Sequence, residues 1–141
     1  WNPDLDENLL IDEYLCGVYG SAAPYLRKYL ETVYDAANAA GKHLYCFNHP
    51  DKPWHTMKLV EKCEALFDEA EKVADNEEIL LRIQKQRLAV RYLRILLTPK
   101  GTPERNALIA VFEPDAIDFG LTMLWERRDM NFCLRVLEGK E

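Results

Sequence analysis

Two long runs, residues 54–74 and 76–97, constrain the fold of this chain more than any other feature. In each run, apolar side chains recur every three or four residues, which is the spacing of one face of an α-helix. The first run places them at Met57, Val60, Cys63, Leu66, Phe67, Ala70 and Val73. The second run places them at Ile79, Leu80, Ile83, Leu88, Val90, Leu93 and Leu97. Because little more than Asp75 and Asn76 separates the runs, they predict an antiparallel helical hairpin.

The two helices of the predicted hairpin carry opposite charges. Acidic side chains prevail on the first helix, whereas arginine and lysine crowd the second. Antiparallel packing would set these faces side by side, where each exposed ion pair contributes at most about 1 kcal/mol. Asn76 is expected to cap the second helix by accepting a hydrogen bond from a free amide in its first turn.

Further helices are expected around the hairpin, over residues 6–16, 21–40, 103–112 and 129–138. Asp4 or Asp6 is expected to cap the first of them, and the glycines between residues 17 and 20 to end it. Pro24 suits the first turn of the next helix. Pro114 is expected to kink or restart the helix that begins near residue 103, which then continues to about residue 119. The sequence therefore predicts an all-α fold, an irregular bundle of five to seven helices around the antiparallel hairpin.

The composition of the 141 residues disfavours several classes of partner. The net charge of −6 and the pI of about 5.1 argue against nucleic acid and anionic membrane surfaces. The apolar stretches fall far short of the roughly 20 residues that span a bilayer. The four cysteines are interpreted as buried free thiols, because a chain with a core of this size does not need disulfides. They are Cys16, Cys46, Cys63 and Cys133.

No complete active site is visible in the sequence. Four residues of types that bind zinc lie close together, namely His43, Cys46, His49 and His55. Their order does not match the paired spacing of structural zinc sites. Most carboxylates fall on polar helix faces, where water solvates them, and none of the common nucleophile, phosphate-loop or zinc-protease motifs occurs. We therefore expect no catalytic residue, no metal and no cofactor.

Aromatic side chains gather in the first 54 residues, and most of them, Tyr14 and Tyr34 included, are interpreted as core. The irregular connection 42–54 holds three of these rings, on Tyr45, Phe47 and Trp54. The rings are expected to pack down onto the helices. Alternatively, they line an edge that binds sugar, which makes them the candidate substrate-binding residues.

The same part of the chain resembles a known family. It begins with W-N-P-D at residues 1–4 and continues into Y-G-x-A-A-P-Y-L at residues 19–26. Residues 66–71 and 82–92 are similar to an L-F-x-E-A-E element and an R-V-x-x-x-R-L-x-x-x-Y element. These elements are typical of a bacterial glycoside-hydrolase-like family with a domain of unknown function, related to α-glucuronidases and hexosaminidases. In that family the W-N-P-D segment and the helix after it close a catalytic (β/α)8 barrel.

The resemblance implies a division of roles along the chain. Residues 1–20 would be the terminal helix of a barrel that is missing here, and residues 21–141 a helical C-terminal domain. The parent would be a secreted protein, extracellular or periplasmic, that acts on oligo- or polysaccharide, and this chain a non-catalytic accessory domain whose partner is the barrel. The apolar side chains of the first helix are expected to lie exposed where the barrel would cover them; they are Leu9, Leu10, Ile11 and Tyr14. The alternative is a free-standing protein-interaction or carbohydrate-binding helical module.

Overall fold

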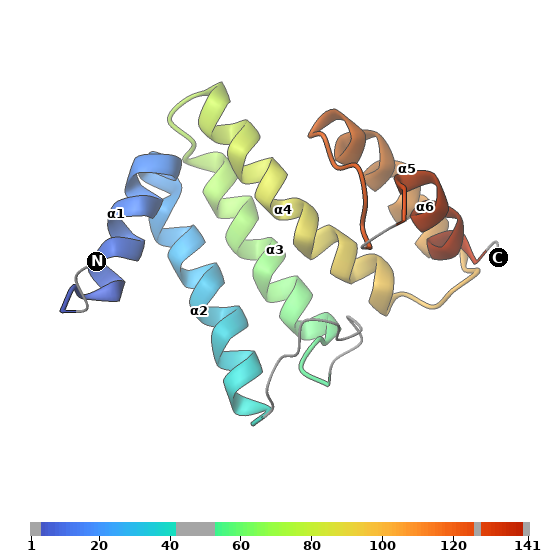
Figure 1. Cartoon of the computed structure of the whole chain (residues 1–141), viewed down its shortest axis with the longest axis horizontal. Helices are drawn as coiled ribbons and strands as arrows, with labels where there is room; N and C mark the ends of the chain where they lie inside the picture. The colour runs from blue at the N-terminus through green and yellow to red at the C-terminus, as the bar shows by residue number, and fades with distance from the viewer. Residues whose placement is uncertain (1–3, 42–52, 126–127, 140–141) are drawn as a thin grey trace. The chain divides into compact units, whose positions relative to one another are not determined.

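A computed structural model of the chain describes residues 4–41, 53–125 and 128–139 (Figure 1). The α-helices in these ranges are α1 (Glu7–Tyr19), α2 (Ala23–Ala39), α3 (Met57–Lys72), α4 (Glu77–Leu97), α5 (Pro103–Asp118) and α6 (Met130–Glu138). A short 3-10 turn, η1 (Gly20–Ala22), joins α1 to α2. Within the same ranges, β structure is limited to an isolated bridge between Trp125 and Arg128. The predicted all-α fold is confirmed.

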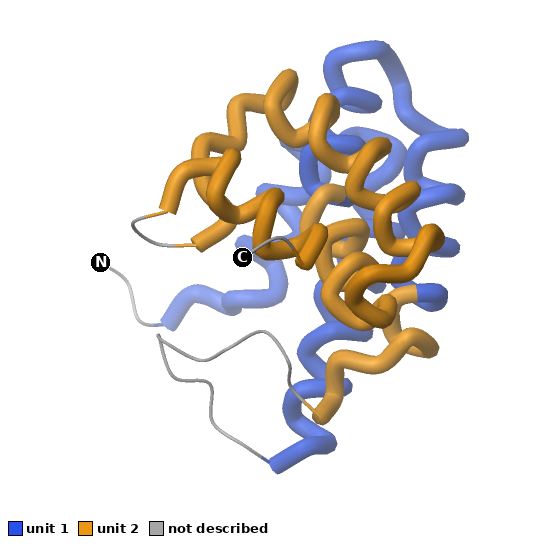
Figure 2. Tube along the Cα trace, turned by 90° about the vertical axis from the view of Figure 1, so that its right-hand side faces the viewer, with its two compact units in different colours: residues 1–43, 61–87 blue, residues 44–60, 88–141 orange. Residues whose placement is uncertain are grey.

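The chain divides into two compact units, and each is described by itself (Figure 2). Unit 1 comprises Trp1–His43 and Glu61–Arg87, and unit 2 comprises Leu44–Val60 and Leu88–Glu141. Both helices of the hairpin, α3 and α4, contribute residues to each unit. Unit 1 contains residues on both sides of position 20. The domain boundary expected there refers to a larger protein, and it stays a prediction.

Helix α1 begins as predicted but ends later. Asp6 caps it by accepting a hydrogen bond of 2.9 Å from the backbone N–H of Asn8. The expected stop at residue 16 is wrong, because the helix continues through Gly17 to Tyr19. A glycine inside a helix costs only about 1 kcal/mol relative to alanine. The burial of Leu15 and Tyr19 on the side of α1 that faces the unit compensates for that cost.

Side chains cap the N-termini of both helices of the hairpin, α3 and α4. Thr56 accepts a hydrogen bond from the backbone N–H of Leu59 at 3.2 Å, and Asn76 accepts one from that of Ile79 at 3.0 Å. The predicted cap at Asn76 is therefore confirmed. Inside unit 1, the Tyr29 ring packs on Phe67 with centroids 4.9 Å apart, and burial raises the pKa of the Tyr29 hydroxyl.

The predicted contact between the acidic and the basic helix of the hairpin is confirmed at Arg87. Its guanidinium lies 2.7 Å from Asp68 and 3.0 Å from Glu71, both on α3. Arg91, one turn further along α4, pairs instead with Asp115 of α5 at 2.6 Å, within unit 2. The charges of α4 therefore hold it to a different helix in each unit.

Unit 2 has its own apolar core between the second half of α4, α5 and α6. The core consists of Leu88, Ile95, Ile109, Phe112, Ala116, Met130, Leu134 and Leu137. Asp129, at the start of the predicted helix 129–138, caps α6 by accepting a hydrogen bond of 2.8 Å from the backbone N–H of Phe132. The last turn of α6 ends at Gly139, whose φ of +81° favours glycine.

Helix α5 continues through Pro114, where the sequence predicted a kink or a restart. Proline has no N–H to donate to the carbonyl group four residues earlier, which belongs to Ala110. Ala110 and Pro114 are both exposed, so water can donate to the carbonyl oxygen that the ring leaves free. The cost of the proline is thereby reduced, and the helix runs on to Asp118.

The cysteine prediction is right for two residues and wrong for one. Cys63 and Cys133 are buried free thiols, and burial raises the pKa of Cys63 to about 11. Cys16 is free but exposed, because it lies on the side of α1 that faces away from the other helices of unit 1. Cys46 lies outside the described residues.

Candidate functional site

The first candidate for a functional surface is the solvent-facing side of α1. Leu9, Leu10 and Tyr14 are 68%, 46% and 63% exposed, as the sequence predicted for the first helix. The interpretation of Tyr14 and Tyr34 as core residues is wrong, because both side chains are exposed. A surface helix normally keeps its apolar residues on the inner side. Helix α1 is apolar on both sides.

Positions three and four residues apart lie together on a helix surface. By this rule one continuous strip is formed by Leu9, Leu10, Glu13, Tyr14, Cys16 and Gly17, all of which are exposed. We call this strip the outer face of α1. Ile11 lies at its flank, and Leu5, just before the helix, is also exposed. Only one of the six residues of the outer face is charged.

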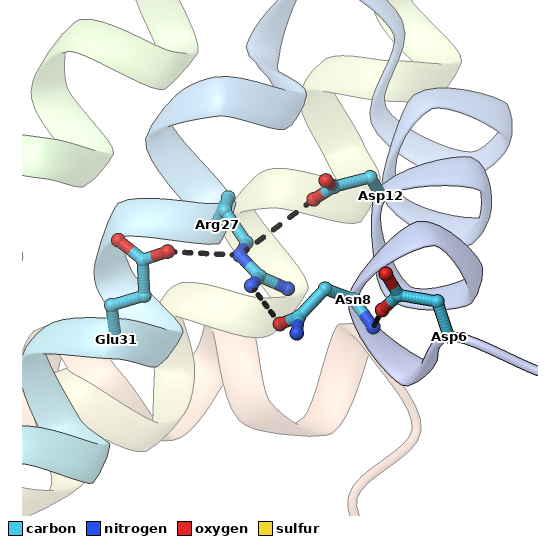
Figure 3. Close-up of polar contacts among 5 residues, drawn as sticks. All are labelled: Asp6, Asn8, Asp12, Arg27 and Glu31. Atoms are coloured by element: carbon cyan, nitrogen blue, oxygen red, sulfur yellow. Dashed lines mark hydrogen bonds and ion pairs between the residues drawn. The ribbon is translucent and has the colours of Figure 1, made fainter.

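Helix α1 is held firmly against α2 on its other side (Figure 3). Arg27 of α2 donates a hydrogen bond of 2.6 Å to the side-chain oxygen of Asn8, and its Nε lies 3.6 Å from Asp12. The same Nε donates to Glu31 at 2.9 Å, which fixes the guanidinium on α2. Since Asn8 and Asp12 must face Arg27, the rotation of α1 about its axis is set. The outer face is therefore turned away from α2.

A second polar cluster fixes the corner between α1 and α2. Asp75, in the turn between α3 and α4, accepts hydrogen bonds from the Ser21 backbone N–H at 2.7 Å and from the Ser21 hydroxyl at 2.6 Å. A Cβ atom on Gly20 would lie 2.0 Å from the Asp75 carboxylate and would force that side chain to shift, and the φ of +51° at Gly20 itself favours glycine. Arg82 donates to the carbonyl oxygen of Val18 at 3.0 Å and also pairs with Glu78.

This corner is structural and not a catalytic pair. The two hydrogen bonds from Ser21 hold the pKa of the Asp75 carboxyl below its usual range. A carboxylate with a lowered pKa is a poor proton acceptor at neutral pH, so Asp75 does not activate the serine hydroxyl. Ala22, at the end of η1, and Ala23, at the start of α2, are buried. Sequence analysis missed this cluster, although a glycine followed by three small residues is a signal of close backbone approach.

Unit 2 contains a buried guanidinium that no sequence pattern predicted. Arg105 is 2% exposed, and it donates to the carbonyl oxygen of Leu137 at 2.8 Å and to that of Thr98 at 2.7 Å. Burial lowers the pKa of Arg105. These carbonyl groups lie at the ends of α6 and α4, where the helix dipole favours a cation. The arginine therefore joins three helices and offers no open site.

An aromatic group lies near the connection from α5 to α6. The indole N–H of Trp125 donates to the Tyr92 hydroxyl at 2.8 Å. The Arg128 guanidinium lies over the Phe132 ring, 4.5 Å from its centroid. These contacts satisfy the polar end of the tryptophan within the unit and secure the start of α6.

The candidate sugar-binding residues remain largely untested. Tyr45 and Phe47 lie outside the described residues, and Trp54 is buried with its ring edge-on to His55 at 5.7 Å. A sugar-binding role for the three rings stays a prediction.

The zinc-type cluster lies mostly outside the described residues, because His43, Cys46 and His49 belong to the segment 42–52. Across residues 4–41, 53–125 and 128–139, no group of three or more histidine, cysteine or acidic side chains is placed to hold a metal ion. In those ranges no helix has the length and apolar character needed to cross a bilayer.

The fold and the outer face define an all-α domain that carries an uncovered apolar helix surface. Comparison with models of protein families, with curated proteins and with solved structures finds no match for this chain. The resemblance to glycoside-hydrolase-like proteins therefore stays a prediction from the sequence elements alone.

Proposed function

We propose that this chain is a non-catalytic accessory domain of a glycoside-hydrolase-like protein and that it docks onto the catalytic barrel of that protein through the outer face of α1. One observation carries the proposal: a helix fixed by Arg27 on its inner side exposes Leu9, Leu10 and Tyr14 on its outer side. The carbohydrate substrate and the extracellular or periplasmic location belong to the proposal through the sequence resemblance.

The size of the apolar surface favours a partner within the same polypeptide. The exposed apolar side chains of α1 leave roughly 500 Å² open to water, near the upper end of what a monomeric protein exposes in one patch. Stable complexes between separate proteins bury about 800 Å² on each side. A smaller surface suffices for a tethered domain, because the linker supplies an effective concentration in the millimolar range.

The burial of this surface is also favourable enough to matter. At about 25 cal/mol per Å², covering roughly 500 Å² contributes on the order of 12 kcal/mol before the costs of association are subtracted. Those costs amount to about 4–15 kcal/mol for free partners and are lower for a tethered one. Docking within one protein is therefore the arrangement in which this face is most readily covered.

The double variant Leu9→Ser/Leu10→Ser in the full-length protein tests the proposal. In calorimetry, the docked domain and the barrel of the wild type are expected to unfold in one coupled transition, and the variant to show two. Leu81→Ser, at a half-exposed leucine on α4, is the matched control and should leave the coupling intact. Two separate transitions in the wild type, an unchanged single transition in the variant, or a natural polypeptide without a second domain would refute the proposal.

A separate measurement addresses the non-catalytic role. The isolated 141-residue chain is expected to show no hydrolysis of aryl glycosides. It is also expected to show no saturable change of tryptophan fluorescence with oligosaccharides. Saturable binding would favour the alternative, a free-standing carbohydrate-binding module.

A further inference from the structure

Glu13 lies in the middle of the apolar strip. Its neighbours at three and four residues' distance are Leu9, Leu10, Cys16 and Gly17, and all of them are exposed. A surface that covers these neighbours also covers the Glu13 carboxylate. Removing a carboxylate from water is costly unless a cation and further hydrogen bonds replace the solvent.

Two cations contact α1 within the described part of unit 1, and both are engaged elsewhere. Arg82 donates to the carbonyl oxygen of Val18 near the end of the helix and pairs with Glu78. Arg27 is engaged by Asn8, Asp12 and Glu31, on a different side of the helix (Figure 3). Residues 4–19 themselves contain five acidic side chains and neither lysine nor arginine. We therefore expect the positive charge opposite Glu13 to come from the surface that covers it.

The same acidity argues against a second copy of this chain as the partner. A symmetric dimer through the outer face would bring two identical helices together, because a two-fold interface uses the same patch on both subunits. Glu13 of one copy would then face the acidic α1 of the other. Like charges at an interface cost several kcal/mol.

Gly17 indicates where the partner comes closest. It lies inside α1 with a helical backbone, and a Cβ atom there would meet nothing within 4 Å. Alanine would stabilise the helix by about 1 kcal/mol at such a position. Nothing in the described chain requires glycine there. A glycine at such a position leaves room for another surface to approach the backbone closely.

We propose that the surface which covers α1 is apolar, carries an arginine or lysine opposite Glu13, and makes its closest approach at Gly17. The inference rests on the proposed docking of α1, and it specifies the chemistry of the barrel face that receives this helix. An arginine fits best, since its planar guanidinium binds a carboxylate through two parallel hydrogen bonds.

Cys16 provides a direct readout, because it lies on the outer face beside Glu13. In the full-length protein with Cys46→Ser as background, the rate of Cys16 alkylation is compared with the rate in the isolated chain. The buried thiols Cys63 and Cys133 react slowly in both and do not obscure the signal. Docking is expected to slow the alkylation of Cys16 at least tenfold.

Charge variants then separate the inference from the docking itself. In the full-length protein, Glu13→Lys is expected to raise the rate of Cys16 alkylation at least tenfold. Glu13→Gln, which keeps the shape of the side chain, is expected to raise this rate about threefold. Glu61→Lys, at an exposed position on α3, is the control and should keep the protection. Circular dichroism of the isolated variants checks that α1 stays helical.

Each outcome bears on a different claim. Protection of Cys16 that persists in both Glu13 variants would overturn the basic partner surface and leave the docking proposal standing. An equal loss of protection in Glu61→Lys would overturn it too, because the effect would then be one of net charge. Absence of protection in the wild type would refute the docking proposal itself.

Discussion

Replacing Arg105 with methionine is expected to destabilise unit 2 by about 3 kcal/mol. The side chain is 2% exposed, and its two hydrogen bonds of 2.8 and 2.7 Å end on the carbonyl oxygens of Leu137 and Thr98. Methionine fills a similar volume but donates no hydrogen bond. Both carbonyl oxygens would then be left without this donor at the ends of α6 and α4.

The magnitude follows from the two carbonyl groups. Each hydrogen bond to a charged donor contributes about 1.5–3 kcal/mol net, and each buried acceptor left unsatisfied costs about 1–3 kcal/mol. The wild type loses part of this gain, since burial of the guanidinium is itself unfavourable and lowers the pKa of Arg105. A net loss of about 3 kcal/mol would lower the Tm by roughly 10 °C for a domain of this size.

Urea denaturation of the isolated chain measures the loss, and hydrogen exchange at the amides of α5 and α6 locates it in unit 2. Arg105→Lys is expected to lose about half as much, because one ammonium group reaches only one of the two carbonyl oxygens well. Arg135→Met, at an exposed position on α6, is the matched control and should change the stability by less than about 0.5 kcal/mol. A loss below about 1 kcal/mol for Arg105→Met would refute the reasoning.

Three further predictions concern unit 1. Gly20→Ala, whose Cβ would lie 2.0 Å from the Asp75 carboxylate at a φ of +51°, is expected to destabilise the unit by at least about 2 kcal/mol in thermal unfolding; an unchanged Tm contradicts this. Gly17→Ala is expected to raise the stability of the isolated chain by about 1 kcal/mol, and a lower Tm would argue against helix at this position. Burial raises the pKa of the Cys63 thiol from 9.0 to about 11, so the unfolded chain loses this proton at a lower pH than the folded chain. The free energy of unfolding of the wild type should therefore fall between pH 9 and 11 more steeply than that of Cys63→Val. Equal slopes would contradict the assignment.

The sequence was sufficient for the parts of the fold that depend on local periodicity and capping. The stripes of α3 and α4, the caps at Asp6, Asn76 and Asp129, and the acidic-to-basic contact at Arg87 all follow from rules that act over a few residues. The end of α1 was placed too early because glycine is a weak helix breaker. Its cost is outweighed by the burial of apolar side chains further along, which a local rule does not include.

The contacts that hold the units together depend on residues far apart in the chain. Ser21 and Asp75 are 54 positions apart, and Arg105 and Leu137 are 32 apart. No spacing rule connects such pairs. For the outer face, exposure was predicted through the family resemblance and not through a spacing rule, and Leu9 and Leu10 are exposed as expected.

The element that carries the family resemblance, Y-G-x-A-A-P-Y-L, has a structural explanation in this fold. Gly20 admits the carboxylate of Asp75, Ser21 binds it, and two buried alanines let the chain turn tightly into α2. A corner held in this way sets the direction of α1, and Arg27 sets its rotation. A helix that is fixed on one side and apolar on the other presents a preorganised surface, and preorganisation lowers the cost of docking. Under the proposed docking, the residues of the element would act through the helix that they orient and not through chemistry of their own.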